Sequence, residues 1–390
     1  MYYIRNIGMT KLVQKSWLLI VTLLLIGCRD KDAINDSDIL SEYLDLPATP
    51  YQYANQEVPT YLDSDLIKQQ DNTPGDNATS NWGATLGRVL FYDKLLSKNN
   101  TIACGFCHKQ AYGFSDTVRF SKGFEGGETK RHSMGLSNAR YRVSGLFFWD
   151  GRAETLEDQV LMPIQDPTEM GLTISELITR VANQPYYEVL FKKAFGNETV
   201  TEDRISKALA QFVRSIQSFQ SRYDQGRSSF DKTEDFSNFS AVENLGKKLF
   251  FDLKKGNCGG CHYTDAFVMD VPRNNGLDVW ESTNDKDIGY EATTSNSADR
   301  GAFIAPSLRN IALRPPYMHD GRFTSLEAVV DHYSDNIRWS PTLDNHLKGS
   351  DPNTAVRFNL TDQEKQALIA FLTTLTDDDI ITDKRFSNPF

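Results

Sequence analysis

Apolar residues recur along this chain mainly at the spacing of an α-helix. After Thr201 they return every three or four positions, so that they share one face of a predicted helix. That face comprises Ile205, Leu209, Phe212, Val213, Ile216 and Phe219. Gly196 is expected to end the preceding helix, because glycine readily adopts the left-handed conformation found at helix ends. A continuous apolar face of this kind predicts packing in a core or against a cofactor.

Three further helices are predicted from their first residues. A Ser or Thr followed three positions later by Glu forms a capping box, which satisfies backbone N–H groups at a helix start. Such pairs are Thr173 and Glu176, Ser240 and Glu243, and Thr361 and Glu364. Few segments alternate as strands do. We therefore predict a mainly α fold, with long loops at about 120–130 and 271–302.

Segments of the first half of the chain return in the second half. Residues 86–93 (LGRVLFYD) resemble 245–252 (LGKKLFFD), and the Asp-Gly-Arg at 150–152 returns at 320–322. A Cys-x-x-Cys-His motif lies between these landmarks in both halves. Chance similarity of short helices is a poor explanation for three landmarks in one order. The pattern predicts two copies of one structural unit.

Length and composition agree with two soluble domains. A chain of 390 residues, 39% hydrophobic and 24% charged, has the composition of a globular protein large enough for two cores. We expect an N-terminal domain at 81–235 and a C-terminal domain at 236–390, after a tether and surface arm at 29–80. The net charge of −10 makes nucleic acid an unsuitable partner.

The chemistry of the chain centres on the two Cys-x-x-Cys-His motifs, at 104–108 and 258–262. This spacing is the attachment signature of a c-type haem, with the His as proximal iron ligand. Cys104, Cys107 and His108 would hold one haem; Cys258, Cys261 and His262 would hold the other. The alternatives are redox disulfides or a zinc site, and a zinc site is disfavoured because the two cysteine pairs lie far apart in the sequence.

The first 28 residues have the pattern of an export signal. Basic residues precede an apolar run at 17–27, which is too short to span a membrane. The run ends in Leu-Ile-Gly-Cys, which resembles the lipobox of bacterial lipoproteins. We expect Cys28 to be lipidated and to anchor the protein on the periplasmic side of a bacterial membrane. The alternative is an ordinary signal peptide that happens to contain a cysteine.

Taken together, the motifs resemble those of the di-haem cytochrome c peroxidase family, which includes MauG. The similarity extends from about Gly83 to Leu375. Its pieces are the two haem motifs, YGFSD at 112–116, FWDGR at 148–152, LEDQ at 156–159, PI at 163–164, PTEMG at 167–171, APSLRN at 305–310 and PYMHDG at 316–321. The resemblance implies two cytochrome c-like haem domains related by internal duplication.

The resemblance also implies unequal roles for the two haems. The haem on His108 would react with hydrogen peroxide, with Glu169 as distal acid and base and Gln159 lining the same pocket. The haem on His262 would supply electrons, and Trp149 would lie between the haems as an electron relay. A carboxylate suits this role because splitting the O–O bond requires moving a proton between the two oxygen atoms.

Two departures concern the peroxidatic side of the family pattern. Many members carry a His in the loop at 121–127 that blocks the iron until the enzyme is reduced; this loop has none. We therefore expect an open, five-coordinate haem in the oxidised protein. The resemblance further implies a calcium ion between the domains, but His132 replaces an Asn ligand. The backbone carbonyls of Arg314 and Pro316 would be the ligands left.

A further departure concerns the second haem. Typical members place a Met ligand fourteen residues after a His that aligns with His319, and this chain has Tyr333 there, as MauG does. A phenolate stabilises ferric iron and lowers the reduction potential. The alternative is that Met318, Met269 or His332 ligates while Tyr333 only packs.

Three functions follow as hypotheses. The leading one is a peroxidase that reduces hydrogen peroxide with electrons from a small cytochrome c or cupredoxin. The second is a MauG-like oxidase that modifies a partner protein, and the third is a di-haem electron carrier without catalysis. The aligned Gln159 and Glu169 argue against a carrier. Members of the family are often homodimers.

Overall fold

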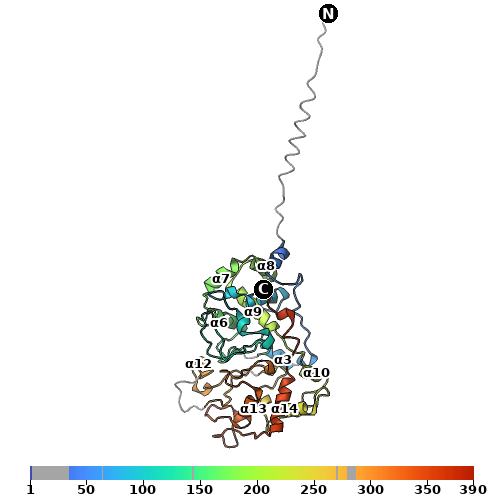
Figure 1. Cartoon of the computed structure of the whole chain (residues 1–390), viewed down its shortest axis with the longest axis vertical. Helices are drawn as coiled ribbons and strands as arrows, with labels where there is room; N and C mark the ends of the chain where they lie inside the picture. Colours follow the sequence, from blue (N-terminus) through green and yellow to red (C-terminus); the bar gives the residue numbers. More distant parts are fainter. Residues whose placement is uncertain (2–34, 64, 143–144, 269–270, 279–286) are drawn as a thin grey trace.

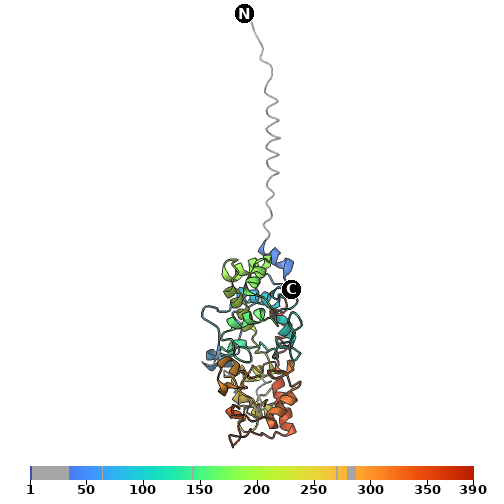
Figure 2. The same cartoon turned by 90° about the vertical axis from the view of Figure 1, so that its left-hand side faces the viewer.

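The computed structural model describes Met1 and residues 35–390, except 64, 143–144, 269–270 and 279–286. Cys28 and the expected signal peptide therefore lie outside the described residues. The described part is built from helices and loops and contains isolated β-bridges but no strand, which confirms the predicted mainly α class. Figures 1 and 2 show two lobes, one above the other along the longest axis.

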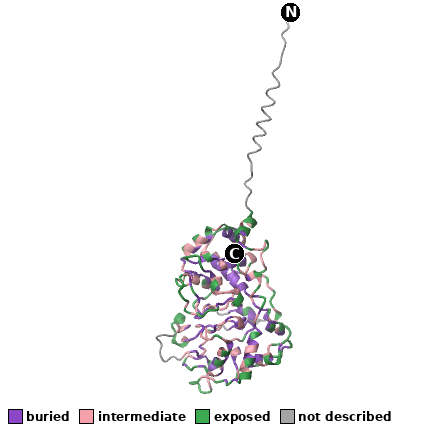
Figure 3. Ribbon diagram, viewed as in Figure 1, coloured by how far each residue is buried: buried purple, intermediate pink, exposed green. Residues whose placement is uncertain are grey.

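Each lobe is organised around one pair of packed helices. In the N-terminal lobe α4 (Asn81–Tyr92) packs on α9 (Glu202–Ser215); in the C-terminal lobe α11 (Ala241–Phe251) packs on α14 (Asp362–Thr373). The other helices are α2 (Asp36–Tyr43), α3 (Asp65–Gln70), α5 (Cys104–Cys107), α6 (Leu156–Gln165), α7 (Ile174–Ala182), α8 (Pro185–Phe195), α10 (Arg222–Arg227), α12 (Glu291–Thr294) and α13 (Leu326–Asp335). Buried residues fill the interior of both lobes (Figure 3).

The duplication is visible in how the paired helices cross. A Cβ atom on Gly87 of α4 would lie 1.9 Å from the carbonyl oxygen of Ala208, and one on Gly246 of α11 would lie 1.8 Å from that of Ala367. Neither contact is possible for a side chain, so each helix pair depends on a glycine to approach this closely. The glycines are the matching positions of the two repeated segments identified in the sequence.

The predicted helix boundaries are confirmed in detail. Thr173, Ser240 and Thr361 each begin a helix with a complete capping box. Gly196 ends α8 with a φ of 83°. Helix α9 ends at Ser215, so Ile216 continues the buried face from the residue after the helix.

Part of the segment predicted to be a tether and surface arm contributes helices and core residues to the N-terminal lobe. Leu40 of α2 and Tyr53 are buried in the N-terminal core, because apolar residues of the arm gain more by packing there than by lying on the surface. The chain's last residues return to the same lobe: Phe386 belongs to its core, and the Tyr53 hydroxyl donates to the Arg385 carbonyl at 2.5 Å. Figure 1 accordingly places the C-terminus in the upper lobe.

A third small core joins the two lobes, because it contains Tyr141 of the N-terminal lobe and Ala266 of the C-terminal lobe. Leu62 and Ile67 pack with Phe219 and Val268 in the same core. Within the described residues, no helix combines the length and hydropathy that crossing a membrane requires.

Candidate active site

The first haem motif lines a cavity in the N-terminal lobe. Helix α5 is a single turn from Cys104 to Cys107, with His108 directly after it. Cys104, Cys107 and His108 line this N-terminal cavity together with Gln159 and Glu169. The structure thus brings together five of the predicted site residues, which are up to 65 positions apart in the sequence.

Both motif histidines are held as neutral imidazoles. The Nδ1 atom of His108 lies 3.0 Å from the Phe114 carbonyl oxygen, and Nδ1 of His262 lies 3.0 Å from that of Phe267. A carbonyl can only accept, so Nδ1 carries the proton and Nε2 keeps its lone pair. Burial lowers the pKa of His108 and lowers that of His262 to about 4. This is the second-sphere arrangement of a metal-ligating histidine.

The motif cysteines form no disulfide, and their thiol groups resist deprotonation. Burial raises the pKa of Cys104 to about 12 and that of Cys107 to about 11. Cys258 and Cys261 show the same pattern, at about 12 and about 11. A redox-active cysteine needs a lowered pKa, so these environments disfavour the redox alternative.

Glu169 lies in the turn after α6 and faces the N-terminal cavity. Burial raises its pKa, the charge of Asp166 raises it further, and the Arg152 guanidinium opposes this rise. A carboxyl group with a raised pKa is suited to proton transfer, because it takes up a proton more readily than an ordinary carboxylate does.

The loop at 121–127, which lacks the blocking His, supports the turn that carries Glu169. The Phe124 N–H donates to the Glu169 carbonyl at 2.9 Å. A Cβ atom on Gly123 would lie 1.6 Å from the Thr168 carbonyl oxygen, so only glycine permits this approach. The loop therefore contributes backbone support to the cavity and no ligating side chain.

Gln159 and Pro163 line the same cavity from α6. Their positions are one helical turn apart, so their side chains lie on the same face. Proline carries no atom that could ligate iron. No hydrogen bond joins the side-chain amide of Gln159 or the carboxyl group of Glu169 to another described residue, so both are available to a small polar ligand.

Trp149 lines the cavity of the second haem motif and also a neighbouring cavity to which His108, Gln159 and Glu169 contribute. Its indole N–H donates to the His132 carbonyl at 2.7 Å, and its ring packs edge-to-face on His319 with centroids 6.4 Å apart. The tryptophan is buried and fixed in orientation by both contacts. This location fits the predicted relay.

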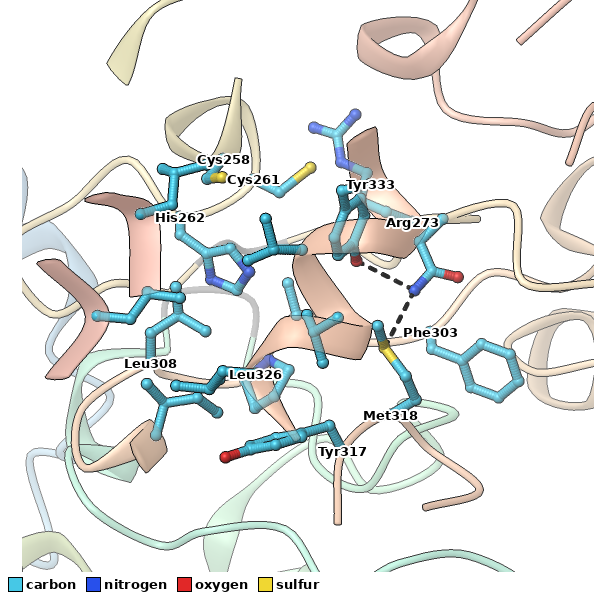
Figure 4. Close-up of a pocket in the computed structure, with 18 of the residues that line it drawn as sticks. Cys258, Cys261, His262, Arg273, Phe303, Leu308, Tyr317, Met318, Leu326 and Tyr333 are labelled. Carbon is cyan, nitrogen blue, oxygen red and sulfur yellow. Dashed lines mark hydrogen bonds between the residues drawn. The ribbon is translucent and has the colours of Figure 1, made fainter. Parts of the chain in front are cut away.

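The second haem motif lines a separate, C-terminal cavity, shown in Figure 4 with Cys258, Cys261 and His262 on one side and Tyr333 and Met318 facing them. Burial raises the pKa of Tyr333. The alternative ligand His332 does not line this cavity, and its Nε2 donates to the Asn275 carbonyl at 3.1 Å. Met269 lies outside the described residues. Tyr333 and Met318 are the two distal candidates that the cavity presents.

The C-terminal cavity also contains a buried cation that suits a haem. Arg314 lines it, and burial lowers the pKa of this guanidinium to about 10. Its Nη2 donates to the Ser307 carbonyl, while its Nε has no partner among the described atoms. A buried cation calls for an anion, and the carboxylate groups of a haem supply one. The thiols, the neutral histidines and this arginine together fit a covalently bound haem.

His132 is buried between the two cavities rather than arranged as a cation ligand. Its Nδ1 lies 3.0 Å from the Val118 carbonyl and its Nε2 lies 3.3 Å from the Ser115 hydroxyl. Burial lowers its pKa, and the positive charge of Arg314 acts in the same direction. No group of three or more His, Cys, Asp or Glu side chains gathers at a metal-binding distance in the described part of the chain.

The sequence did not identify two side chains that line the C-terminal cavity. Asn275 donates its side-chain amide to Tyr333 and to Met318, and Arg314 was considered only for its backbone carbonyl. A single Asn or Arg in a loop carries no periodicity or motif. The one available signal for Asn275 was its place in the long loop predicted at 271–302, and a long loop singles out no residue.

This fold and these sites define a c-type di-haem oxidoreductase. The chain belongs to the family of di-haem cytochrome c peroxidases and MauG proteins, and membership implies two covalently attached c-type haems. The family model for di-haem cytochrome c peroxidase matches residues 81–231.

Individual relatives include both branches of the family. The methylamine utilization protein MauG of Methylorubrum extorquens is 36% identical over 293 residues, covering 74% of this chain and 77% of that protein. The cytochrome c551 peroxidase of Nitrosomonas europaea is 34% identical over 248 residues, covering 64% and 71%. Among solved structures, a MauG-like protein associated with microbial copper homeostasis matches with a TM-score of 0.73 and 33% identity, covering 86% of this chain and 99% of that one.

Proposed function

We propose that this protein is a peroxidase that reduces hydrogen peroxide to water at its N-terminal haem. The proposal rests on the N-terminal cavity. His108, Glu169 and Gln159 line it together, and Pro163, which also lines it, has no atom that could ligate iron. A cavity with an acid–base group and an open distal face serves a reacting ligand. An electron carrier needs neither, so we place that hypothesis last.

A haem held by Cys104, Cys107 and His108 would supply the iron that binds peroxide and passes electrons to it. Glu169 would take the proton from the inner peroxide oxygen and return it to the outer one, which then leaves as water. Gln159 would orient the peroxide by hydrogen bonding without competing for this proton. One peroxide yields two waters and consumes two electrons and two protons.

The electrons would enter on the C-terminal side and pass Trp149. Leu253 and Tyr263 are exposed beside the second motif, with 71% and 50% of their surface accessible. Apolar side chains at this point suit transient contact with a small redox protein, here a small cytochrome c or cupredoxin. Trp149 carries an oxidisable ring and lines both the C-terminal cavity and the neighbouring cavity to which His108 contributes.

The second candidate function is MauG-like oxidation of a partner protein. Tyr333 facing the second motif favours it, because a phenolate ligand stabilises oxidised iron. Both functions begin with peroxide at the N-terminal haem, so they differ in what reduces the oxidised enzyme. No described surface identifies a protein substrate.

Steady-state turnover separates the two functions. With reduced cytochrome c as donor, sustained consumption of peroxide supports the peroxidase function. If the protein reacts quickly with peroxide but does not oxidise the donor repeatedly, the result favours oxidation of a partner protein instead. Stopped-flow mixing of the fully oxidised protein with peroxide tests the open haem. If the protein reacts only after prior reduction, the proposed open state is wrong.

Export and lipid anchoring at Cys28 are part of the same proposal. Metabolic labelling with a fatty acid should mark the wild-type protein in the membrane fraction, and a Cys28→Ser variant should be unlabelled. Light scattering of the purified protein tests the homodimer that the resemblance implies.

A further inference from the structure

Asn275 makes an unusual pair of contacts at the C-terminal cavity. Its side-chain nitrogen donates to the Tyr333 hydroxyl oxygen at 3.2 Å and to the Met318 sulfur at 3.6 Å (Figure 4). One amide group thus contacts both distal candidates at once. An amide nitrogen carries two hydrogens, so it can serve both acceptors together.

Hydrogen bonds hold the residues before and after Asn275 to neighbouring segments. The Arg273 N–H and carbonyl exchange hydrogen bonds with Phe303, and the Gly276 carbonyl accepts from Arg338. The neighbouring Asn274 is buried and donates to Ser340 and Thr342. The backbone that carries Asn275 is therefore held by these hydrogen bonds.

Helix α13 is tied to the same residue at two consecutive positions. His332 donates to the Asn275 backbone carbonyl at 3.1 Å, while Tyr333 accepts from its side chain. These bonds fix the rotation of the helix, and with it the direction of Tyr333. Asn275 consequently determines both where the phenol oxygen lies and which hydrogen bond it accepts.

Met318 competes with Tyr333 for the distal position of the C-terminal haem. Its backbone has a φ of 75°, and Phe148, at the equivalent turn of the first lobe, has a φ of 65°. This backbone conformation therefore belongs to the duplicated turn and does not depend on ligation, and Met318 lines the cavity.

The hydrogen bond decides between these two donors. The Asn275 amide nitrogen lies 3.2 Å from the Tyr333 oxygen and 3.6 Å from the Met318 sulfur, so both atoms compete for one donor group. Sulfur is a weak acceptor, so the same amide stabilises the oxygen donor much more than the sulfur donor. Without the amide, the Tyr333 oxygen loses the donor that holds it in place, and the Met318 sulfur becomes the better-placed ligand.

We propose that Asn275 is a positioning residue that selects Tyr333 over Met318 as the distal ligand of the C-terminal haem. This inference rests on the proposed ligation by Tyr333. On this proposal, the low reduction potential that tyrosinate ligation gives the C-terminal haem depends on Asn275. This residue is not itself a ligand and lies on a different loop of the chain.

The test replaces Asn275 in the haem-loaded, full-length protein. An Asn275→Leu variant should lose the tyrosinate-type low-spin signal in electron paramagnetic resonance, gain the near-infrared methionine-to-iron charge-transfer band, and show a higher reduction potential for the second haem. Adding Met318→Leu should remove the new band. Asn336→Leu, which removes an exposed amide at the end of the same helix, should leave all three readouts unchanged.

A parallel Tyr333→Phe variant separates the two possible failures. If Tyr333→Phe leaves the low-spin signal unchanged, Tyr333 is not the ligand and the inference fails with it. If that variant alters the signal and folded Asn275→Leu does not, only the selecting role of Asn275 is wrong. The nearly isosteric Asn275→Asp, which places a carboxylate beside the phenol, should lose the signal in the same way; unchanged spectra in this variant would also overturn the inference.

Discussion

Pro163 and Tyr333 occupy the same position, the eighth residue, in the duplicated helices α6 and α13. Both side chains line the cavity of their own haem motif. At this one position the first lobe has a residue that cannot ligate and the second has one that can. On the proposed ligation by Tyr333, this matched pair would account for an open haem in the first lobe and a six-coordinate haem in the second.

Removing the carboxylate of Glu169 should slow peroxide turnover without changing the fold. A Glu169→Gln variant loses the acid–base group, a loss worth about 10²–10⁴-fold in kcat/KM. Stopped-flow and steady-state assays measure it. Glu188→Gln, an exposed carboxyl group on α8, is the matched control, and full activity in Glu169→Gln would remove the proposed role.

The pH dependence should report the same group. The proton acceptor must be ionised, and burial raises the pKa of Glu169 above that of an ordinary carboxyl group. The value of kcat/KM should therefore fall as the pH is lowered through that raised pKa, already above the usual range for Glu. Glu169→Gln should lose this acidic limb; a variant that keeps it assigns the titration to another residue.

Replacing Trp149 by Phe should slow electron transfer between the haems and leave the first reaction with peroxide unchanged. The substitution removes the indole N–H and leaves the buried His132 carbonyl without its donor, at a cost of about 1–3 kcal/mol in the free energy of unfolding. Rapid-mixing spectroscopy of half-reduced protein measures the transfer. An unchanged rate would show that Trp149 is only a packing residue.

The two crossing glycines should be equally intolerant of a side chain. Gly87→Ala and Gly246→Ala each force a Cβ onto a facing carbonyl, and overpacking of this kind costs about 1–3 kcal/mol. Denaturant unfolding measures the change. Gly75→Ala is the control, because nothing lies within 4 Å of its added Cβ, and equal stability of all three variants would contradict the close crossing.

Calcium should bind weakly. The guanidinium of Arg314 lies close enough to act on the pKa of His132, and a buried positive charge repels a divalent cation. Elemental analysis is expected to find less than one calcium per chain, and chelation should leave turnover unchanged. One tightly held calcium per chain, lost with activity on chelation, would contradict this.

The sequence by itself determined the features that depend on local chemistry. Cysteine and histidine spacing specified the two haem attachments, because attachment needs only residues within one turn of chain. The capping boxes located three helix starts for the same reason. Repeated segments predicted the duplication, and the spacing of Leu209 and Phe212 predicted the buried face of α9.

Only the tertiary structure decided what faces each cavity. The contacts of Asn275 with Tyr333 and Met318 span 58 and 43 positions of the chain, and no local pattern encodes contacts at such separations. The same holds for the arm and the C-terminal residues, where Tyr53 and Arg385 meet across 332 positions. Their apolar residues have no periodicity of their own, so their burial follows from the surface that the two lobes offer once folded.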